Sequence, residues 1–307
     1  CLLGNARLSI IDLQSGDQPM SCDGGRFTIV YNGELYNFNG IRQRLQRAGQ
    51  VFRTQSDTEV ILNGFSAQAQ QSLSQLNGIF AFAIWDAVRS SLFLARDHLG
   101  IKPLYYAKTD DFFVFGSEIK AIFASDLVAK RVNEKAMFDY LCRQAPPYLD
   151  TMFEGVYELE PGTWMEVLAS GEIKSGKYFH LEDDWRQFEG LPSTETDVTQ
   201  LVEERIELSV QRQLISDVPV GIALSGGMDS AIVYSYMSKE YPETLHAFTY
   251  ANTASEINEF GKAADVIEHL GGRASHHVTR VEVSDSLRYF KEASRLLDSP
   301  VAYQSSI

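Results

Sequence analysis

The stretch Leu224-Ser225-Gly226-Gly227-Met228-Asp229-Ser230 decides the fold of the second half of this 307-residue chain. It joins an apolar, strand-like run at 218–224 to a helix-like run at 231–240. Strand-like and helix-like runs continue to alternate after it, which is typical of a parallel sheet with crossover helices. We therefore expect an α/β domain with a parallel sheet. Its further elements are strands at 245–250 and from 276 onward, and a helix at 259–270.

The composition of this stretch points to an anion site. Two adjacent glycines, Gly226 and Gly227, allow a tight turn and leave no Cβ between the backbone and a ligand. The N–H groups at the start of the following helix, with the hydroxyls of Ser225 and Ser230, would donate to phosphate oxygens. Because a carboxylate beside bound phosphate repels it unless a cation intervenes, Asp229 implies Mg²⁺. The plainer alternative is a strand–helix turn with an Asp-Ser cap.

The first half follows a different pattern. Runs rich in aromatic and β-branched residues are separated by turn residues, which favours antiparallel sheets, and helix-like runs interrupt them. We expect an α+β domain over residues 1–185, with helices packed on sheets. Its predicted strands cover 7–12, 27–31, 78–85, 91–96, 104–107 and 112–115, and its predicted helices cover 38–48, 57–65, 118–123, 134–142 and a short Gln-rich run around 68–75.

The polar segment 181–197 separates the two patterns and has the composition of a linker. Beyond it, apolar residues recur at every fourth position from Val198 to Leu214, which predicts an amphipathic helix capped by Asp197. We expect the second domain to cover residues 195–307.

Charge and cysteine content narrow the function classes. Lys+Arg 27 against Asp+Glu 41 gives a net charge of −14, which argues against a basic face that tracks nucleic acid. No apolar run is long enough to span a bilayer, so we expect no membrane partner. Cys1, Cys22 and Cys142 cannot all pair and form no CxxC, which disfavours a disulfide scaffold or a zinc site. We expect a cytoplasmic protein.

The adjacent histidines His276 and His277 favour packing or surface roles over a metal pair. They lie in a strand-like run, and neighbouring residues of a strand face opposite ways.

Polar residues of the first half could hold an α-amino acid by both ends. Near a reacting carbonyl, the Asn32 amide and the Gly33 N–H could serve as oxyanion donors. Arg7 could grip a carboxylate, while Glu34 and Asp57 could receive an ammonium group. Asn-Gly is also a common hairpin signal, but the residues from 38 onward form a helix-like run instead of a returning strand.

The Ser225–Ser230 segment resembles the SGGxDS loop of the ATP pyrophosphatases, which activate a carboxyl group as its adenylate. The likeness implies that the loop holds the leaving pyrophosphate and that Asp229 is a Mg²⁺ ligand. By position alone, the backbone near Ala223 and at Tyr250 would meet the adenylate. The implied ATP-binding residues are Ala223, Ser225, Gly226, Gly227, Asp229, Ser230 and Tyr250.

Nearly the whole chain resembles glutamine-hydrolysing asparagine synthetases. The matching segments are RLSIIDL at 7–13, QPM at 18–20, NGELYN at 32–37, SDTEVIL at 56–62, RDHLGIKPLYY at 96–106, SEIKA at 117–121 and PG at 161–162. The likeness implies an Ntn-hydrolase-like class II glutamine amidotransferase domain followed by an ATP-pyrophosphatase-like synthetase domain, in a homodimer. It also implies that Arg7, Glu34 and Asp57 bind glutamine, and that Asn32 and Gly33 form the oxyanion hole.

The sequence departs from this family at Cys1. The family's N-terminal cysteine attacks the glutamine amide and is followed by Gly-Ile, whereas Leu2-Leu3-Gly4 follows here. The family's HRGPD segment before the Arg-Leu-Ser strand and its later SGEGxDE segment have no counterpart. We therefore expect Cys1 to be an ordinary strand residue, the nucleophile to be absent, and the chain to be truncated at both ends; a naturally degenerate member is the alternative.

The resemblance predicts glutamine-dependent, ATP-dependent formation of asparagine from aspartate, with release of AMP and pyrophosphate. The alternative within enzymes is a related adenylating amidotransferase or cyclase that acts on another carboxylate, as in β-lactam or peptide synthesis. A third hypothesis is a non-catalytic nucleotide-binding module. The expected ligands are glutamine, aspartate and ATP.

Overall fold

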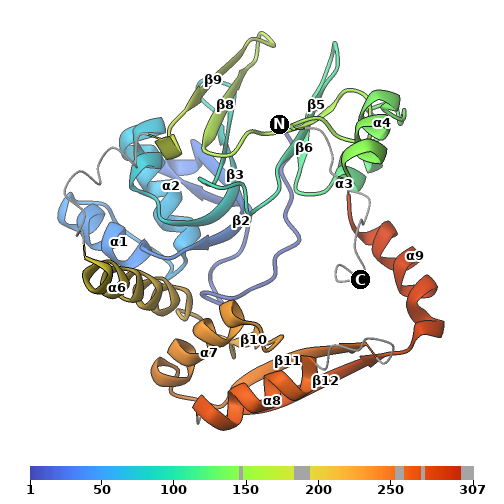
Figure 1. Ribbon diagram of the computed structural model, residues 1–307. Coiled ribbons are helices and arrows are strands. Elements are labelled where there is room, and N and C mark those ends of the chain that lie inside the picture. The colour runs from blue at the N-terminus through green and yellow to red at the C-terminus, as the bar shows by residue number, and fades with distance from the viewer. Residues whose placement is uncertain (145–147, 183–193, 253–258, 271–273, 299–307) are drawn as a thin grey trace. The chain divides into compact units, whose positions relative to one another are not determined.

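The computed structural model describes residues 1–144, 148–182, 194–252, 259–270 and 274–298 (Figure 1). The chain divides into two compact units. Unit 1 comprises Cys1–Arg186 with Ser294–Ser306, and unit 2 comprises Gln187–Ala293 with Ile307. The predicted domain limits, 1–185 and 195–307, remain a prediction, because most of the segment between them lies outside the described residues.

Unit 1 is built on a six-stranded antiparallel sheet of order β1-β2-β3-β4-β8-β9. The two central strands are buried along almost their whole length, which requires cover on both faces of the sheet. The strands are β1 (Met20–Cys22), β2 (Phe27–Leu35), β3 (Gly78–Asp86), β4 (Ser91–Arg96), β8 (Thr163–Leu168) and β9 (Ile173–Lys177).

Helices α1 (Phe38–Arg47) and α2 (Asp57–Gln68) cover one face of this sheet. Their apolar side chains share one core with alternate residues of the sheet's strands, such as Ile29 and Tyr31 of β2. The intervening residue Val30 packs in a second core on the opposite face. This is the two-residue alternation expected of a strand with both faces buried.

A second, three-stranded antiparallel sheet covers that opposite face (Figure 1). Its order is β6-β5-β7. The remaining elements of unit 1 are β5 (Tyr105–Lys108), β6 (Phe113–Gly116), β7 (Val156–Glu158), α3 (Ile119–Ala124), α4 (Glu134–Arg143) and the 3₁₀ turns Asp23–Gly25 and Ala69–Gln75. The expected α+β class is therefore confirmed, and the Gln-rich run forms a 3₁₀ helix.

The prediction of a strand at 7–12 was wrong, because no strand precedes Met20. The Arg7 guanidinium donates from Nη2 to the carbonyl oxygens of Ile11 (2.6 Å) and Asp12 (3.0 Å). Asp12 has a positive φ of 53°, and its carboxylate accepts from the Ser15 N–H at 3.0 Å. A side chain therefore binds the carbonyls that a neighbouring strand would need, and the segment turns. Cys1 is exposed and outside any strand, so its expected role as a strand residue was also wrong.

Unit 2 contains a three-stranded parallel sheet of order β10-β11-β12, formed by β10 (Gly221–Ala223), β11 (Leu245–Asn252) and β12 (Ala274–Val281). The expected α/β class with a parallel sheet is confirmed. The core joins strand residues to residues of the helices between them. The helices are α6 (Glu195–Gln213), α7 (Met228–Glu240), α8 (Glu259–Leu270) and α9 (Ser286–Leu296), with a 3₁₀ turn at Val283–Asp285.

Helix α6 begins earlier than predicted. Its N-cap is Thr194, whose hydroxyl accepts from the Asp197 N–H at 3.2 Å, so the predicted cap, Asp197, is a donor within the first turn. A hydroxyl that accepts three residues ahead is a standard N-cap. In the described residues, no helix is both long enough and apolar enough to cross a membrane.

Candidate functional sites

Strand β2 carries three of the predicted site residues of unit 1. It runs on through Asn32, Gly33 and Glu34, which pair with Ala81, Phe80 and Ile79 of β3. A Cβ added at Gly33 would lie 2.2 Å from the Ile79 carbonyl oxygen. The Asn-Gly pair therefore serves a close strand contact and is not a hairpin turn.

The Gly33 N–H points away from β3. In an antiparallel pair, the N–H groups of alternate residues point to the same side. The N–H groups of Tyr31 and Leu35, two positions before and after Gly33, donate to Gln18 Oε1 (2.6 Å) and Asp57 Oδ2 (3.0 Å) instead of to β3. The opposite residue, Phe80, directs its own N–H and carbonyl to Asp97. The Gly33 N–H thus faces the side of β2 away from the ladder, as an oxyanion donor must.

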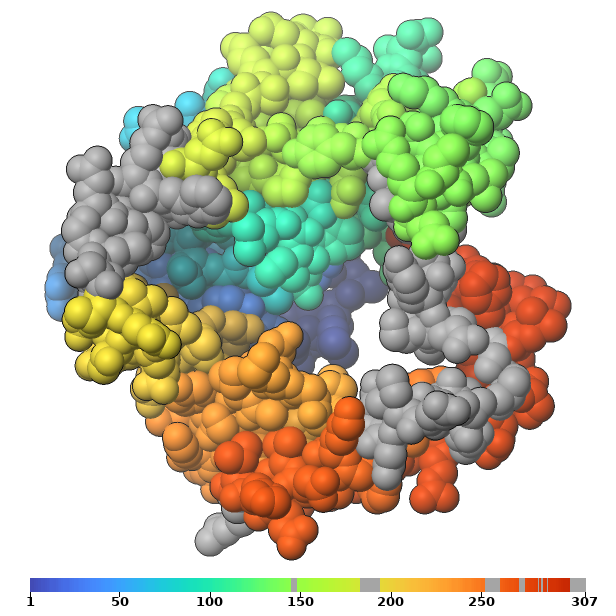
Figure 2. All heavy atoms as spheres, in the orientation of Figure 1, coloured from blue at the N-terminus to red at the C-terminus, as the bar shows by residue number. Residues whose placement is uncertain are grey.

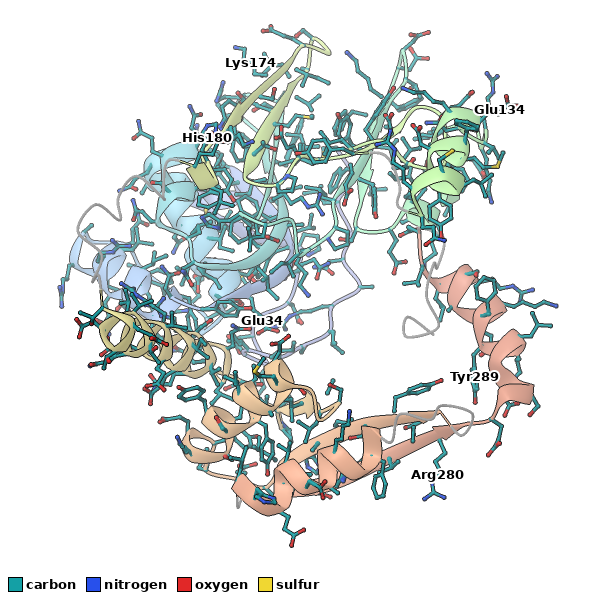
Figure 3. The ribbon with its side chains drawn as sticks, viewed as in Figure 1. Glu34, Glu134, Lys174, His180, Arg280 and Tyr289 are labelled. Carbon is teal, nitrogen blue, oxygen red and sulfur yellow. The ribbon has the colours of Figure 1, made fainter. Side chains whose placement is uncertain are left out.

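Asn32 and Glu34 project from the same face of β2, because they are two residues apart. Asn32 is exposed, and its Nδ2 donates to Ser117 Oγ at 3.3 Å. Glu34, labelled in Figure 3, is half-buried. Burial raises the pKa of its carboxyl group, the positive charge of Lys102 lowers it, and the negative charge of Asp57 raises it further. A nearby ammonium group would relieve this destabilisation of the carboxylate.

Arg7 retains an unused hydrogen-bond donor. Its Nη2 is occupied by the carbonyls of Ile11 and Asp12, whereas its Nη1 is buried and has no partner in the described part of the chain. A buried donor without a partner is costly, so such groups are expected to meet a ligand or water. A carboxylate would satisfy it.

Asp57, which the sequence predicted to receive an ammonium group, lies in a buried position. It is only 5% exposed, at the first position of α2. Its Oδ2 accepts from the Tyr31 hydroxyl (2.9 Å) and the Leu35 N–H (3.0 Å), and its Oδ1 accepts from the Thr58 N–H (2.9 Å). Burial raises the pKa of Asp57, and these hydrogen bonds act against that rise. The structure thus gives this carboxylate protein partners, and its role towards a ligand stays a prediction.

Asp97 supports this site, although sequence reasoning assigned it no role. Its Oδ1 accepts from the N–H groups of Leu99 (3.1 Å) and Ile101 (2.9 Å), and its Oδ2 accepts from those of Phe80 (3.1 Å) and Lys102 (2.9 Å). One carboxylate therefore fixes both the backbone opposite Gly33 and the loop that carries Lys102 towards Glu34. The available signal was an acidic residue just before the turn at Gly100, which has φ +69°.

In unit 2, the predicted phosphate loop lies between β10 and α7. Gly226 has φ +74°, and a Cβ there would come within 2.5 Å of Lys262 Cβ and 2.7 Å of the Ala263 nitrogen in α8. Only glycine fits, because both the backbone conformation and the available space exclude a side chain. Gly227 is the N-cap of α7. The first N–H groups of this 13-residue helix have no partner within the helix and can bind an anion.

The two serines of the loop lie together. Ser225 Oγ and Ser230 Oγ are 3.2 Å apart, the Gly227 N–H approaches Ser225 Oγ at 3.3 Å, and Ser230 Oγ donates to the Gly227 carbonyl at 3.1 Å. Both hydroxyls can rotate towards a ligand. The loop thus brings together the donors that sequence reasoning assigned to it.

Asp229 is exposed in the first turn of α7. One carboxylate with phosphate oxygens and water is a donor set that suits Mg²⁺. Within the described residues, no cluster of three or more His, Cys, Asp or Glu side chains could hold a metal by itself.

Ala223 and Tyr250 are exposed on neighbouring strands, with Ala223 at the end of β10 and Tyr250 two residues before the end of β11. Ala223 is the last residue of β10 and pairs with Phe248 of β11, two residues before Tyr250. Ligands of open parallel sheets bind beyond the carboxyl ends of the strands, and these two residues lie close to that edge of the sheet.

Comparison with known proteins gives two family matches on this chain. Glutamine amidotransferase domains match residues 1–179, and the asparagine synthase family matches residues 201–307.

Three curated relatives illustrate the similarity. Asparagine synthetase 3 (glutamine-hydrolysing) of Bacillus subtilis strain 168 is 34% identical over 315 residues, covering 97% of this chain and 50% of that protein. Asparagine synthetase B (glutamine-hydrolysing) of Escherichia coli K12 is 32% identical over 302 residues, covering 93% and 47%. Amidase chry2 of Gibberella zeae is 36% identical over 238 residues, covering 77% and 34%. The chain thus spans about half the length of the two synthetases.

Proposed function

The chain belongs to the family of glutamine-hydrolysing asparagine synthetases, and from that premise we propose that it takes part in the glutamine-dependent synthesis of asparagine. Glutamine and water give glutamate and ammonia in unit 1. In unit 2 a side-chain carboxylate oxygen of aspartate attacks the α-phosphorus of ATP and releases pyrophosphate. Ammonia then attacks the acyl carbon and displaces AMP. Adenylation is needed because a free carboxylate is a poor electrophile.

For unit 1 we propose that Arg7 binds the α-carboxylate of glutamine and that Glu34, with Asp57, binds its ammonium group. The partnerless Nη1 of Arg7 and the raised pKa of the Glu34 carboxyl, caused first by burial, support this assignment. The side chain of Asn32 and the N–H of Gly33 would stabilise the oxyanion that forms when the amide carbonyl is attacked.

We do not assign the attacking thiol to Cys1, in agreement with the sequence analysis, which also argued against Cys1 as the nucleophile. Cys1 is exposed and lies in a segment without regular structure. No attacking group is assigned within this chain, so Cys1→Ser should change neither glutamine binding nor any glutamine hydrolysis that the chain shows; hydrolysis that the substitution abolishes would identify Cys1 as the nucleophile.

For unit 2 we propose that the loop from Ser225 to Ser230 binds the phosphates of ATP, with Ala223 and Tyr250 near the adenylate. Asp229 would hold Mg²⁺, which would neutralise charge on the phosphates. The observation that carries the proposed function is the left-handed Gly226 pressed against α8, because it shapes the loop as an anion site within the part that matches asparagine synthases.

The test is a product assay on the chain with aspartate, ATP and Mg²⁺, and with ammonia or glutamine as the nitrogen source. AMP, pyrophosphate and asparagine should form in equal amounts with ammonia. Absence of AMP with every donor would contradict the proposal. Product with ammonia but not with glutamine would limit the activity of the chain to unit 2.

A second candidate function keeps the adenylation and changes the acceptor to another carboxylate. This candidate is supported by a relative of 36% identity that bears the name amidase and not asparagine synthetase. Pyrophosphate release with a different carboxylic acid, but not with aspartate, would select it.

We further propose a cytoplasmic homodimer that binds neither nucleic acid nor membranes. The net charge of −14 supports the first exclusion, since phosphate backbones repel an acidic surface. Sedimentation of the purified protein would give the oligomeric state.

A further inference from the structure

Thr249 lies in β11 behind the phosphate loop. It is 3% exposed, and its hydroxyl oxygen is 2.6 Å from the Leu224 carbonyl oxygen and 2.8 Å from His276 Nε2. Leu224 directly precedes Ser225, the first residue of the loop. The sequence assigned no role to Thr249, and it favoured only a packing or surface role for His276.

Proton counting fixes the direction of both hydrogen bonds. The Thr249 hydroxyl has one proton, and the Leu224 carbonyl can only accept, so the hydroxyl donates to Leu224. His276 Nε2 must therefore be the donor to the Thr249 oxygen, and it carries a proton. The result is a directed chain from His276 through Thr249 to the Leu224 carbonyl.

Helix α8 contacts both His276, where this hydrogen-bond chain begins, and the loop residue Gly226. The His276 ring stacks on Phe260 of α8, with centroids 5.4 Å apart and planes 21° from parallel. The backbone of α8 at Lys262 and Ala263 meets Gly226 so closely that a Cβ at the glycine is excluded. Helix α8 packs against β11 and β12 (Figure 1), and its residues lie at the orange-red part of the colour scale in Figure 2. It therefore supports the loop directly at Gly226 and indirectly through His276.

The hydrogen bonds from His276 through Thr249 to the Leu224 carbonyl set the orientation of the Ser225 N–H. The carbonyl of Leu224 and the N–H of Ser225 belong to one planar trans peptide and point in opposite directions. Since Thr249 holds that carbonyl on the buried side of the loop, the Ser225 N–H must point to the other side. The preceding peptide is also fixed, because the Leu224 N–H donates to the Phe248 carbonyl at 2.8 Å.

We propose that Thr249 and His276 are positioning residues of the phosphate site, which orient the Leu224–Ser225 peptide so that its N–H faces the phosphates. The inference rests on the proposed function of unit 2, because it takes the ligand to be the phosphates of ATP. Neither side chain touches the ligand.

The first test measures binding of MgATP and of inorganic pyrophosphate to the 307-residue chain by calorimetry. Thr249→Val removes the hydroxyl and keeps the shape, and it should weaken both ligands about tenfold, the equivalent of one hydrogen bond. Thr249→Ser should restore binding to within about threefold of the original. The matched control is Thr199→Val in α6, where an exposed hydroxyl also donates to a backbone carbonyl, that of Glu195 at 2.8 Å.

The second test uses His276. His276→Phe keeps the stacking on Phe260 but removes the donor, whereas His276→Gln keeps an N–H donor. The first should weaken pyrophosphate binding and the second should restore it. Because both residues act through one carbonyl, the Thr249→Val/His276→Phe double variant should bind no more weakly than Thr249→Val alone.

Normal binding by both Thr249→Val and His276→Phe would overturn the proposal, as would additive losses in the double variant. If Thr249→Val fails to fold, the His276 pair decides alone. A chain that binds neither MgATP nor pyrophosphate before any substitution would contradict the proposed function itself. That result is distinct from a binding-competent chain in which the substitutions have no effect.

Discussion

At the scale of single residues, two side chains of the same chemical type can have different surroundings and therefore different roles. Both Glu34 and Asp57 are acidic; Glu34 lies in β2 and Asp57 accepts hydrogen bonds from that strand. Glu34 is half-buried near the charge of Lys102, whereas Asp57 is enclosed by backbone and hydroxyl donors. A carboxylate whose oxygens are already occupied contributes first to stability. The two residues should therefore respond differently to the same isosteric change.

Replacing Asp57 with asparagine should destabilise unit 1 by roughly 2 kcal/mol or more, because an NH₂ group would face the N–H or O–H donors that the carboxylate now accepts. Urea unfolding followed by tryptophan fluorescence measures this, since Trp85 and Trp164 both lie in unit 1. Asp110→Asn, in the exposed turn between β5 and β6, is the control and should be neutral. Unchanged stability of Asp57→Asn would show that the carboxylate is not a structural anchor.

Replacing Gly226 with alanine should abolish MgATP binding and destabilise unit 2. The left-handed φ costs about 1–2 kcal/mol, and the clash with the α8 backbone adds to it. The matched control is Gly171→Ala. Gly171 has φ +83° but open space around an added Cβ, so this substitution should cost only the free energy of the left-handed backbone and not that of a clash. Thermal melts by circular dichroism and calorimetry with MgATP give the two readouts. Equal effects of the two substitutions on stability would contradict the close packing of Gly226 on α8.

At the scale of elements, side chains decide where strands and helices begin. The sequence predicted a strand at 7–12 from β-branched content, but Arg7 and Asp12 bind the backbone of that segment and turn it. Likewise Thr194, and not Asp197, caps α6. Composition does not reveal this, because a side-chain donor and a neighbouring strand are alternative hydrogen-bond partners for the same backbone carbonyl.

The β3–β4 turn gives a pH-dependent prediction at this scale. The Asp86 carboxylate accepts from the N–H groups of Val88 (2.9 Å) and Arg89 (3.1 Å) and pairs with Arg26 (3.1 Å). Burial acts to raise the pKa of Asp86, but the hydrogen bonds from Arg26, Arg89 and Val88 outweigh it and lower the pKa.

A carboxyl group whose pKa is lowered by folding stabilises the protein above its unfolded pKa, about 3.9, and loses that contribution as the pH falls through the folded value. Asp86→Asn should therefore cost about 1–3 kcal/mol at pH 7, and the difference from the parent should shrink below about pH 4. Urea unfolding at a series of pH values measures it, with Asp111→Asn as a neutral control. A difference that does not change with pH would rule out the charged form as its source.

At the scale of the whole molecule, two units of different class carry the two halves of the proposed reaction. Each predicted site lies within one unit: Asn32, Gly33, Glu34 and Arg7 in unit 1, and the phosphate loop in unit 2. Their ligand affinities should therefore be separable by substitution.

Glu34→Gln should weaken glutamine binding at least tenfold, because it removes the charge that faces the ammonium group, and should leave MgATP binding unchanged. Asp229→Asn should do the reverse. Calorimetry with each ligand on each variant measures all four affinities. Loss of MgATP binding in Glu34→Gln would contradict the separation of the two sites.

The amino-acid sequence alone was enough to predict the class of both units, the glycine-rich turn between β10 and α7 and most strands of the sheets, because hydrophobic period, glycine position and strand–helix alternation are local properties of the chain. It placed α8 correctly at both ends and β2 to within a few residues. The partners of the polar side chains became clear only from the packed fold. Gln18 donates to the Thr58 hydroxyl and Asp12 accepts from the Gln55 N–H, although these partners are 40 and 43 positions apart in the sequence. The Asp97 carboxylate and the Thr249 hydroxyl also bind backbone groups of distant strands. These contacts depend on which strands become neighbours, and no local pattern encodes that choice.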